Sequence, residues 1–203
     1  MADPSKFSDL GIYYMYHLTL LLLIIAEAFI FFYTHQSTGT DKRKKADKGT
    51  KWMLIINFYI CIYISFFMVS NNVHDRIVDL KLPVAFSYIG VVLMLTGIVI
   101  RLLAVFTLKR AFTLSVQTAK TQNLITTGIY SKVRNPAYSG SICSLLGTAI
   151  GLRSPIATVI VLVLSFVCYS TRIYIEEKAL RKHFGNEFID YEKHTFRLIP
   201  LVW

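Results

Sequence analysis

The sequence predicts an all-α polytopic membrane protein with about five transmembrane helices, a helical hairpin formed by the fourth and fifth, and an amphipathic C-terminal cytoplasmic helix. Of its 203 residues, 54% are hydrophobic and only 17% are charged, whereas soluble domains carry nearer 25% charged residues. The apolar residues gather in runs close to the roughly 20 residues that a helix needs to cross a bilayer. A chain in hydrocarbon must satisfy its backbone polar groups internally, which favours helices.

Five apolar segments follow one another in what we interpret as one domain over residues 1–203. They are expected at Gly11–Tyr33, Trp52–Ser70, Pro83–Thr107, Tyr138–Leu152 and Ile156–Tyr174. Pro83 suits a helix start because the N–H groups of the first turn have no partner within the helix. The tail from Glu176 onward is charged and amphipathic, and we expect it to break at Gly185.

The fourth apolar segment is the shortest. Its roughly 15 residues would extend about 22 Å, less than a hydrocarbon core of about 30 Å. We therefore expect either a shallow hairpin with the fifth segment or a locally thin crossing. Gly147 and Gly151 have the spacing that lets a second helix approach closely. We assign this approach to the hairpin, with a dimer contact as the alternative.

Lys and Arg concentrate in three segments, which follow the first, third and fifth helices. If the chain crosses the membrane five times, these three basic segments lie on the same side. An excess of Lys and Arg is typical of the cytoplasmic side. The N-terminus is therefore expected outside, with the C-terminus and the active site in the cytoplasm. The net charge of +10 would suggest nucleic acid in a soluble protein. Here the membrane-side bias explains it, and we expect no nucleic-acid partner.

Two charged residues fall inside the first three predicted helices. Arg101 lies near the cytoplasmic end of the third helix, where it is expected to snorkel to the interface. Glu27 lies well inside the first helix, where a lipid-facing carboxylate is unfavourable. We expect Glu27 to pair internally or to lie near an aqueous cavity. Cys61, Cys143 and Cys168 show no metal-ligand spacing, and no metal site is predicted.

Four motifs supply amide donors, aromatic faces and paired carboxylates, and all are expected at the cytoplasmic surface. They are Gln122–Tyr130, Arg134–Tyr138, Arg172–Glu177 and Phe184–Tyr191 with its ending Arg197–Pro200. In this order, with a helical hairpin between them, the motifs resemble the isoprenylcysteine carboxyl methyltransferase family and its phospholipid-methyltransferase relatives. The resemblance begins at about Phe106. The chain departs from the family at Asn135, where His is usual, and Asn does not titrate.

The resemblance implies S-adenosylmethionine-dependent methyl transfer to a lipid-like substrate, preferably the carboxylate of a prenylated cysteine or a similar lipidic acid. Residues 1–105 would hold transmembrane helices one to three, and residues 106–203 the cofactor-binding and catalytic part. Helical spacing puts Arg172 and Glu176 on one face, and arginine is well shaped to hold a carboxylate through two parallel hydrogen bonds. We therefore predict Arg172, to hold the acceptor carboxylate, and Glu176 as the catalytic residues. The cofactor-binding residues that the resemblance implies are Gln122, Leu124, Ile125, Gly128, Tyr130, Arg134, Asn135, Pro136, Tyr138, Glu176 and Glu177.

Other interpretations of the same residues stay open. Within the class, the runner-up is N-methylation of a phospholipid headgroup. A membrane sterol or fatty-acyl reductase has a similar tail, although the Glu176–Glu177 pair argues against it, and a non-enzymatic subunit would bind no cofactor. Tyr130 and Tyr138 could be interfacial belt residues. Arg172 and Glu176, four residues apart on a helix, could be only a surface ion pair.

Overall fold

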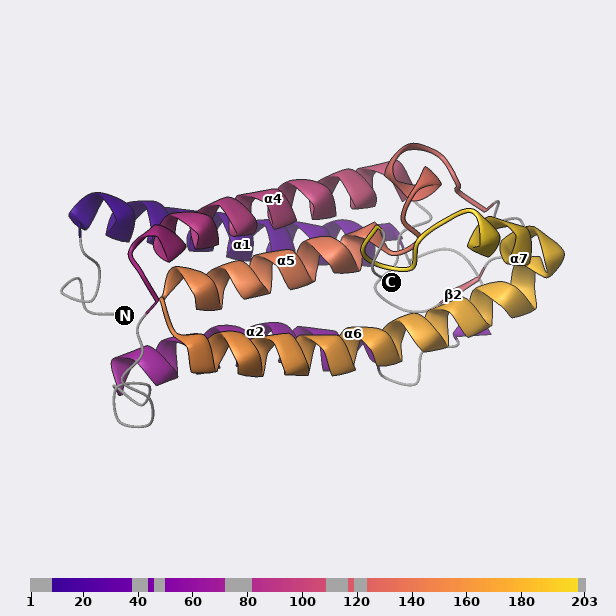
Figure 1. Ribbon diagram of the computed structural model, residues 1–203. Coiled ribbons are helices and arrows are strands. Elements are labelled where there is room, and N and C mark those ends of the chain that lie inside the picture. The colour runs from indigo at the N-terminus through magenta and orange to yellow at the C-terminus, as the bar shows by residue number, and fades with distance from the viewer. Residues whose placement is uncertain are drawn as a thin grey trace.

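The computed structural model describes residues 9–37, 44–45, 50–71, 82–108, 117–118 and 124–200. Within these ranges the regular secondary structure is helical apart from one short strand pair (Figure 1). The elements are α1 (Leu10–Ser37), β1 (Lys44–Lys45), α2 (Thr50–Ser70), α4 (Ala85–Leu108), β2 (Gln117–Thr118), the 3-10 helix η3 (Gly128–Ser131), α5 (Pro136–Gly151), α6 (Pro155–Phe184) and α7 (Asn186–Lys193). All five predicted apolar segments are helices, and the all-α fold class is confirmed.

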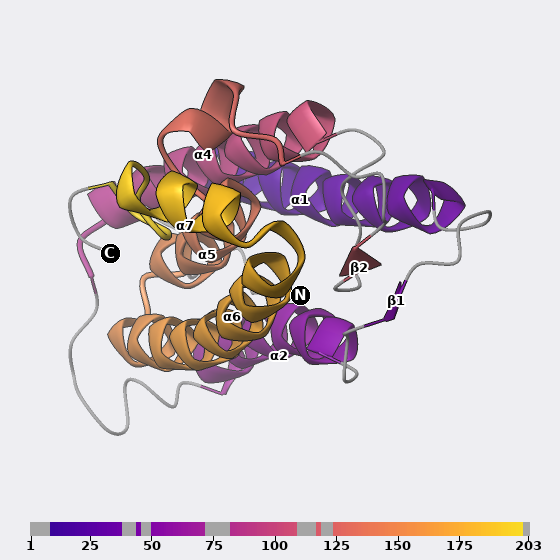
Figure 2. The same ribbon diagram turned by 90° about the vertical axis from the view of Figure 1, so that its right-hand side faces the viewer.

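The helices form a membrane bundle around a short central helix. Within the described ranges, α1, α2, α4 and α6 are long and apolar enough to cross a membrane. Helix α5, which corresponds to the fourth apolar segment, has 16 residues and extends about 24 Å. It lies between α4 and α6 in both views (Figures 1 and 2), and most of its residues are buried. Because protein rather than lipid surrounds α5, its length does not have to match the bilayer.

The fifth apolar segment does not end where its charged residues begin. Helix α6 continues from Pro155 to Phe184, so the expected end at Tyr174 was wrong. No Pro or Gly interrupts this stretch, and Glu, Lys and Arg are good helix formers. The break at Gly185 is confirmed. Its backbone, with φ 56° and ψ −125°, has a conformation open essentially to glycine alone.

The closest helix packing joins α4 and α5 through glycines. A Cβ on Gly147 would lie 2.7 Å from the carbonyl oxygen of Gly90. A Cβ on Gly140 would lie 2.7 Å from the carbonyl oxygen of Gly97. The Gly147–Gly151 spacing therefore serves contact with α4, and our assignment of it to the hairpin was wrong. The hairpin itself is present, because α5 turns directly into α6 and packs along it (Figure 1).

A methyl group at this contact should destabilise the bundle. We expect Gly147→Ala to lower the free energy of unfolding by about 1–3 kcal/mol, the usual range for overpacking, because the clashing atoms are backbone. Gly11→Ala is the matched control, since its Cβ would meet only side-chain atoms of Asp9 and no backbone. Thermal unfolding in detergent measures both, and equal midpoints for the two variants would contradict the role of the glycine contact.

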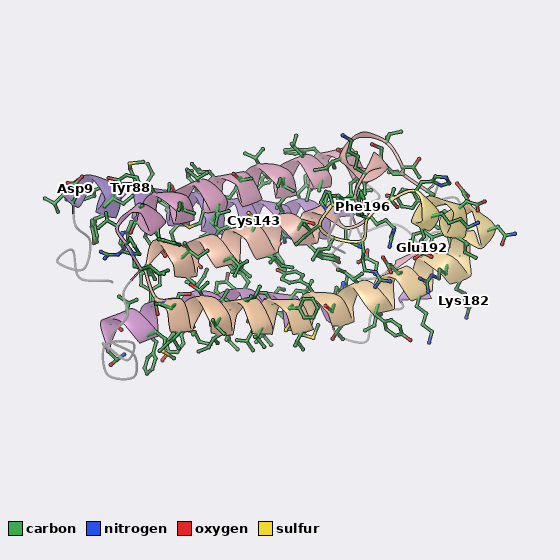
Figure 3. All side chains as sticks on the ribbon, viewed as in Figure 1. Asp9, Tyr88, Cys143, Lys182, Glu192 and Phe196 are labelled. Carbon is green, nitrogen blue, oxygen red and sulfur yellow. The ribbon has the colours of Figure 1, made fainter. Side chains whose placement is uncertain are left out.

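The helices that precede the basic segments end at the same end of the molecule (Figure 1). Helices α1, α4 and α6 all run toward this end, where α7 also lies (Figure 1). Strand β1, in the loop after α1, pairs antiparallel with β2, in the loop after α4. Figure 3 shows Lys182 and Glu192 at this end and Asp9 and Tyr88 at the other. Of the basic loop at residues 41–48, only Lys44–Lys45 belong to the described ranges.

The Lys and Arg bias predicts which end faces the cytoplasm. In a variant lacking Cys61, Cys143 and Cys168, a membrane-impermeant maleimide should label Asp9→Cys in intact cells. It should label Lys182→Cys only after permeabilisation. Labelling of both positions from one side would refute five crossings, and the reverse pattern would refute the orientation.

Candidate active site

The candidate site lies where η3, the start of α5, the end of α6 and the C-terminal tail meet (Figure 1). Backbone hydrogen bonds fasten the tail to the segment before α5. The amide of Arg134 donates to the carbonyl of Phe196 at 2.8 Å, and the amide of Phe196 donates to the carbonyl of Lys132 at 2.9 Å. Residues about sixty positions apart in sequence are thereby held side by side.

One buried carboxylate, Glu177, joins these elements. Only 3% of the residue is exposed. Its Oε1 accepts hydrogen bonds from Arg134 Nε at 3.2 Å and Asn135 Nδ2 at 3.3 Å. Its Oε2 accepts from Arg197 Nε at 3.1 Å, with Arg197 Nη2 also 3.1 Å away. A buried charge is tolerated when it is paired and hydrogen-bonded in this way.

Arg134 and Asn135 extend the same network into the tail. Arg134 Nη1 donates to the carbonyl of Glu192 at 3.0 Å. Asn135 Nδ2 donates to the carbonyl of Arg197 at 2.9 Å as well as to Glu177. One amide nitrogen reaches both acceptors because it carries two N–H donors. The described contacts of Arg134 and Asn135 hold the tail against the start of α5, and the prediction that both residues bind the cofactor stays a prediction.

A second polar cluster lies one turn away along α6. Tyr138 donates from its hydroxyl to Glu176 Oε2 at 2.6 Å. Arg172 donates from Nε to the Tyr138 oxygen at 3.1 Å, and the same nitrogen is 3.8 Å from Glu176 Oε2. The Arg172 side chain is 1% exposed and that of Glu176 is 28% exposed. Because the arginine is buried, the interpretation of this pair as a surface ion pair was wrong.

The two adjacent carboxylates therefore have different surroundings. Both oxygens of Glu177 are occupied by side chains of this protein. Glu176 is partly exposed and accepts a hydrogen bond from a neutral phenol. We predicted that both carboxylates would face the positive end of a cofactor, and direct contact by Glu177 does not fit its contacts. That Glu176 faces the positive end of a cofactor stays a prediction.

Tyr130 is part of a small core rather than an interfacial belt. Its ring is buried with Ala104 and Ala137, and its hydroxyl donates to the carbonyl of Ala104 at 3.4 Å. Its own carbonyl accepts from the Tyr191 hydroxyl at 2.6 Å. Burial raises the pKa of Tyr130 above its ordinary value and raises the pKa of Tyr191 to about 12. Both phenols therefore stay protonated near neutral pH and act as donors.

The remaining residues that we predicted to bind the cofactor lie just before η3 or at the first residue of η3 or α5, apart from Gln122. Leu124 and Ile125 are half-buried just before η3, and Pro136 is the buried first residue of α5. Gly128 opens η3 with φ 62°, in the left-handed region where glycine is favoured. Gln122 lies outside the described residues.

An apolar cavity of about 320 Å³ adjoins the second cluster, because Tyr138 lines it. Its walls come mainly from α1 and α2. Phe32, Trp52 and Tyr59 line it and are each more than half exposed, so they mark a rim that opens between these two helices. Arg101 is among its polar lining residues. The complete lining is Glu27, Ala28, Ile30, Phe31, Phe32, Trp52, Leu54, Ile55, Phe58, Tyr59, Arg101, Tyr138 and Tyr169.

Arg101 does not snorkel, contrary to the sequence-based expectation. Its Nη2 donates to Glu27 Oε2 at 2.7 Å, and its Nε faces the other oxygen of Glu27. Its Nη1 donates to the carbonyl of Ala137 at 3.1 Å and to the hydroxyl of Ser141. Glu27 thus pairs internally and also lines a cavity. The sequence showed that two opposite charges lie in apolar helices. It did not show that α1 and α4 pack so that these two side chains meet.

These features define a polytopic membrane protein with an apolar cavity, walled mainly by two helices, whose lining also includes charged and phenolic groups. Among the described residues, no group of three His, Cys, Asp or Glu side chains could hold a metal ion. Residues 86–187 match the family described as phospholipid methyltransferase, and the chain belongs to this family.

Similar proteins are named as methyltransferases of prenylated cysteine. A probable protein-S-isoprenylcysteine O-methyltransferase of Oryza sativa is 36% identical over 118 residues, covering 57% of this chain and 62% of that protein. The Saccharomyces cerevisiae protein-S-isoprenylcysteine O-methyltransferase is 29% identical over 160 residues, which cover 77% of this chain and 66% of that protein. The solved structure of a eukaryotic intramembrane Ras methyltransferase, an isoprenylcysteine carboxyl methyltransferase, matches with a TM-score of 0.58 and 27% sequence identity. The match covers 71% of this chain and 51% of that chain. The chain therefore matches about half to two thirds of each relative's length.

Removing the charge of Glu177 should loosen the tail. Glu177→Gln keeps the size but leaves two arginines without their carboxylate. We expect the tail to open more easily by about 3–5 kcal/mol, as when a buried ion pair loses one partner. Faster hydrogen exchange over residues 194–200 and faster tryptic cleavage at Lys193 or Arg197 measure this. Glu187→Gln, an exposed change on α7, is the control, and equal protection in both variants would contradict the anchoring role.

Proposed function

We propose that this protein transfers a methyl group from S-adenosylmethionine to the carboxylate of a prenylated cysteine or a similar lipidic acid. The observation that carries the proposal is the apolar cavity whose polar end presents Arg101 and Tyr138, directly beside the partly exposed Glu176. The cavity suits a lipid chain, the arginine suits a carboxylate, and Glu176 suits a cation. The names of the similar proteins support the same substrate class.

The groups around Glu176 fit a sulfonium cofactor. When bound, S-adenosylmethionine supplies an electrophilic methyl group, and the bond from that carbon to sulfur breaks as the acceptor oxygen bonds to it. Glu176 offsets the positive charge of the sulfonium. Tyr138 and Tyr169, whose ring centroids are 5.5 Å apart, supply aromatic faces, which attract a cation in a poorly hydrated site. We propose that the adenosine portion lies toward Gln122, Leu124, Ile125 and Gly128.

The acceptor needs to be held rather than deprotonated. A carboxylate is already a nucleophile at neutral pH, so no general base is required. In-line methyl transfer then depends mainly on how the two reactants are positioned. We propose that the lipid chain occupies the cavity and that the carboxylate approaches Arg101, which can form two parallel hydrogen bonds with it.

Arg172 takes a different part from the direct clamp that the sequence suggested. It does not line this cavity and donates to the Tyr138 hydroxyl. We propose that Arg172 is a positioning residue that orients Tyr138 and Glu176. A phospholipid amine as acceptor would bring an ammonium group toward the guanidinium of Arg101 and would also have to lose a proton. The carboxylate is therefore favoured.

Methyl transfer can be tested with the purified protein in lipid nanodiscs. With labelled S-adenosylmethionine, we expect base-labile methyl ester on a farnesylated cysteine derivative and no label on phosphatidylethanolamine. Glu176→Gln should weaken S-adenosylmethionine binding roughly 10- to 100-fold, because it removes the carboxylate that pairs with the sulfonium, whereas binding of the uncharged thioether S-adenosylhomocysteine should change much less. Glu187→Gln should leave binding unchanged.

Arg172→Lys separates positioning from charge within the same assay. Lysine keeps the charge but loses the planar fork, so turnover should fall far more than cofactor affinity. Wild-type turnover in this variant would remove the positioning role. Label on phosphatidylethanolamine alone would instead identify headgroup N-methylation, and binding of NADPH without S-adenosylhomocysteine would identify a reductase.

A further inference from the structure

Glu27 and Arg101 form an ion pair inside the cavity whose geometry resembles an occupied carboxylate site. The two oxygens of Glu27 face Nε and Nη2, which make up one edge of the guanidinium. The remaining nitrogen, Nη1, is held by the carbonyl of Ala137 and the hydroxyl of Ser141, both on α5. One edge of the arginine is thus anchored to the protein, and the other edge holds a carboxylate.

Both members of the pair line the cavity, so a ligand bound in the cavity could contact them. The side chains of Glu27 and Arg101 are 19% and 10% exposed, and both belong to the cavity wall. Two parallel hydrogen bonds to one edge of an arginine are also the preferred geometry for an external carboxylate. The edge held by Glu27 is therefore the one that a carboxylate ligand would use. Like charges repel at close range, which disfavours sharing of that edge by two carboxylates.

We propose that Glu27 is an internal substitute for the acceptor carboxylate: it occupies Arg101 in the empty site and yields that edge when the acceptor binds. This inference rests on the proposed function, because it requires an acceptor that carries a carboxylate. The exchange keeps Arg101 paired before and after binding, and an unpaired buried charge is strongly destabilising. Methylation converts the acceptor into a neutral ester, which no longer balances the guanidinium, and Glu27 then returns to it.

The position of Glu27 in the fold agrees with this role. It lies on α1, whose Phe31 and Phe32 line the same cavity and are exposed at its rim. A side chain released from Arg101 therefore moves within an existing space and does not enter a packed core. Helix α1 also lies outside residues 86–187, the part that matches the family, so this feature belongs to the N-terminal part of the cavity wall.

The exchange predicts opposite responses for an acid and its methyl ester. We expect Glu27→Gln to bind farnesylcysteine acid about tenfold or more tightly than wild type, because no internal carboxylate competes for Arg101. Affinity for the farnesylcysteine methyl ester should change by about twofold at most, because a neutral ester does not compete with Glu27. Equilibrium binding in nanodiscs measures both ligands, and Glu187→Gln is the control with the same change of charge at an exposed site.

Glu27→Asp makes the test independent of whether the neutral variant folds. It keeps the charge but is one methylene shorter, so it should hold Arg101 less well and give an acid affinity between wild type and Glu27→Gln. If either folded variant binds the acid no more tightly than wild type does, Glu27 is only a structural brace and the exchange is wrong. If the acid and the ester gain affinity equally, the exchange is also wrong. Wild-type protein that binds neither ligand would overturn the proposed function, and the exchange with it.

Discussion

The arrangement of the candidate site depends on the buried carboxylate of Glu177. A charge at this depth requires several donors, and no single segment of the chain supplies them. Arg134 and Asn135 come from the segment before α5, and Arg197 comes from the tail. Satisfying one carboxylate therefore folds the tail back across the start of α5. The neighbouring Glu176, which lies one residue earlier on α6, instead accepts a hydrogen bond from Tyr138, a residue that lines the cavity.

Helix packing sets the second condition for the site. The glycines of α4 and α5 let the two backbones meet closely, which places the short α5 between the longer helices. This position brings Ala137 and Tyr138, at the start of α5, next to Arg101 of α4 and Arg172 of α6. A bulkier interface would move the first turn of α5 away from both arginines, and the polar end of the cavity would lose its geometry.

The cavity combines two parts of the chain with different relationships to known proteins. Tyr138 and Tyr169 come from the segment that matches the phospholipid methyltransferase family, as does Arg101. Most of the apolar wall comes from α1 and α2, which precede that segment. The shape of the cavity, and the internal carboxylate within it, are thus features of the N-terminal helices. The proposed chemistry and the proposed binding of a lipid chain would therefore be divided between the two parts.

The amino-acid sequence by itself determined the helices, because apolar runs of membrane length have few structural alternatives. It also determined the break at Gly185 and the motifs that gather at one end of the bundle. Only the tertiary structure decided which charges meet. Glu27 and Arg101 lie 74 residues apart, and Glu177 and Arg197 lie 20 residues apart across a break in the chain. Helical periodicity governs contacts three or four residues apart, but packing between helices governs these. The same reason explains why the partner of Gly147 proved to be α4: a glycine in one helix shows that close approach is allowed, and the identity of the approaching helix depends on the whole fold.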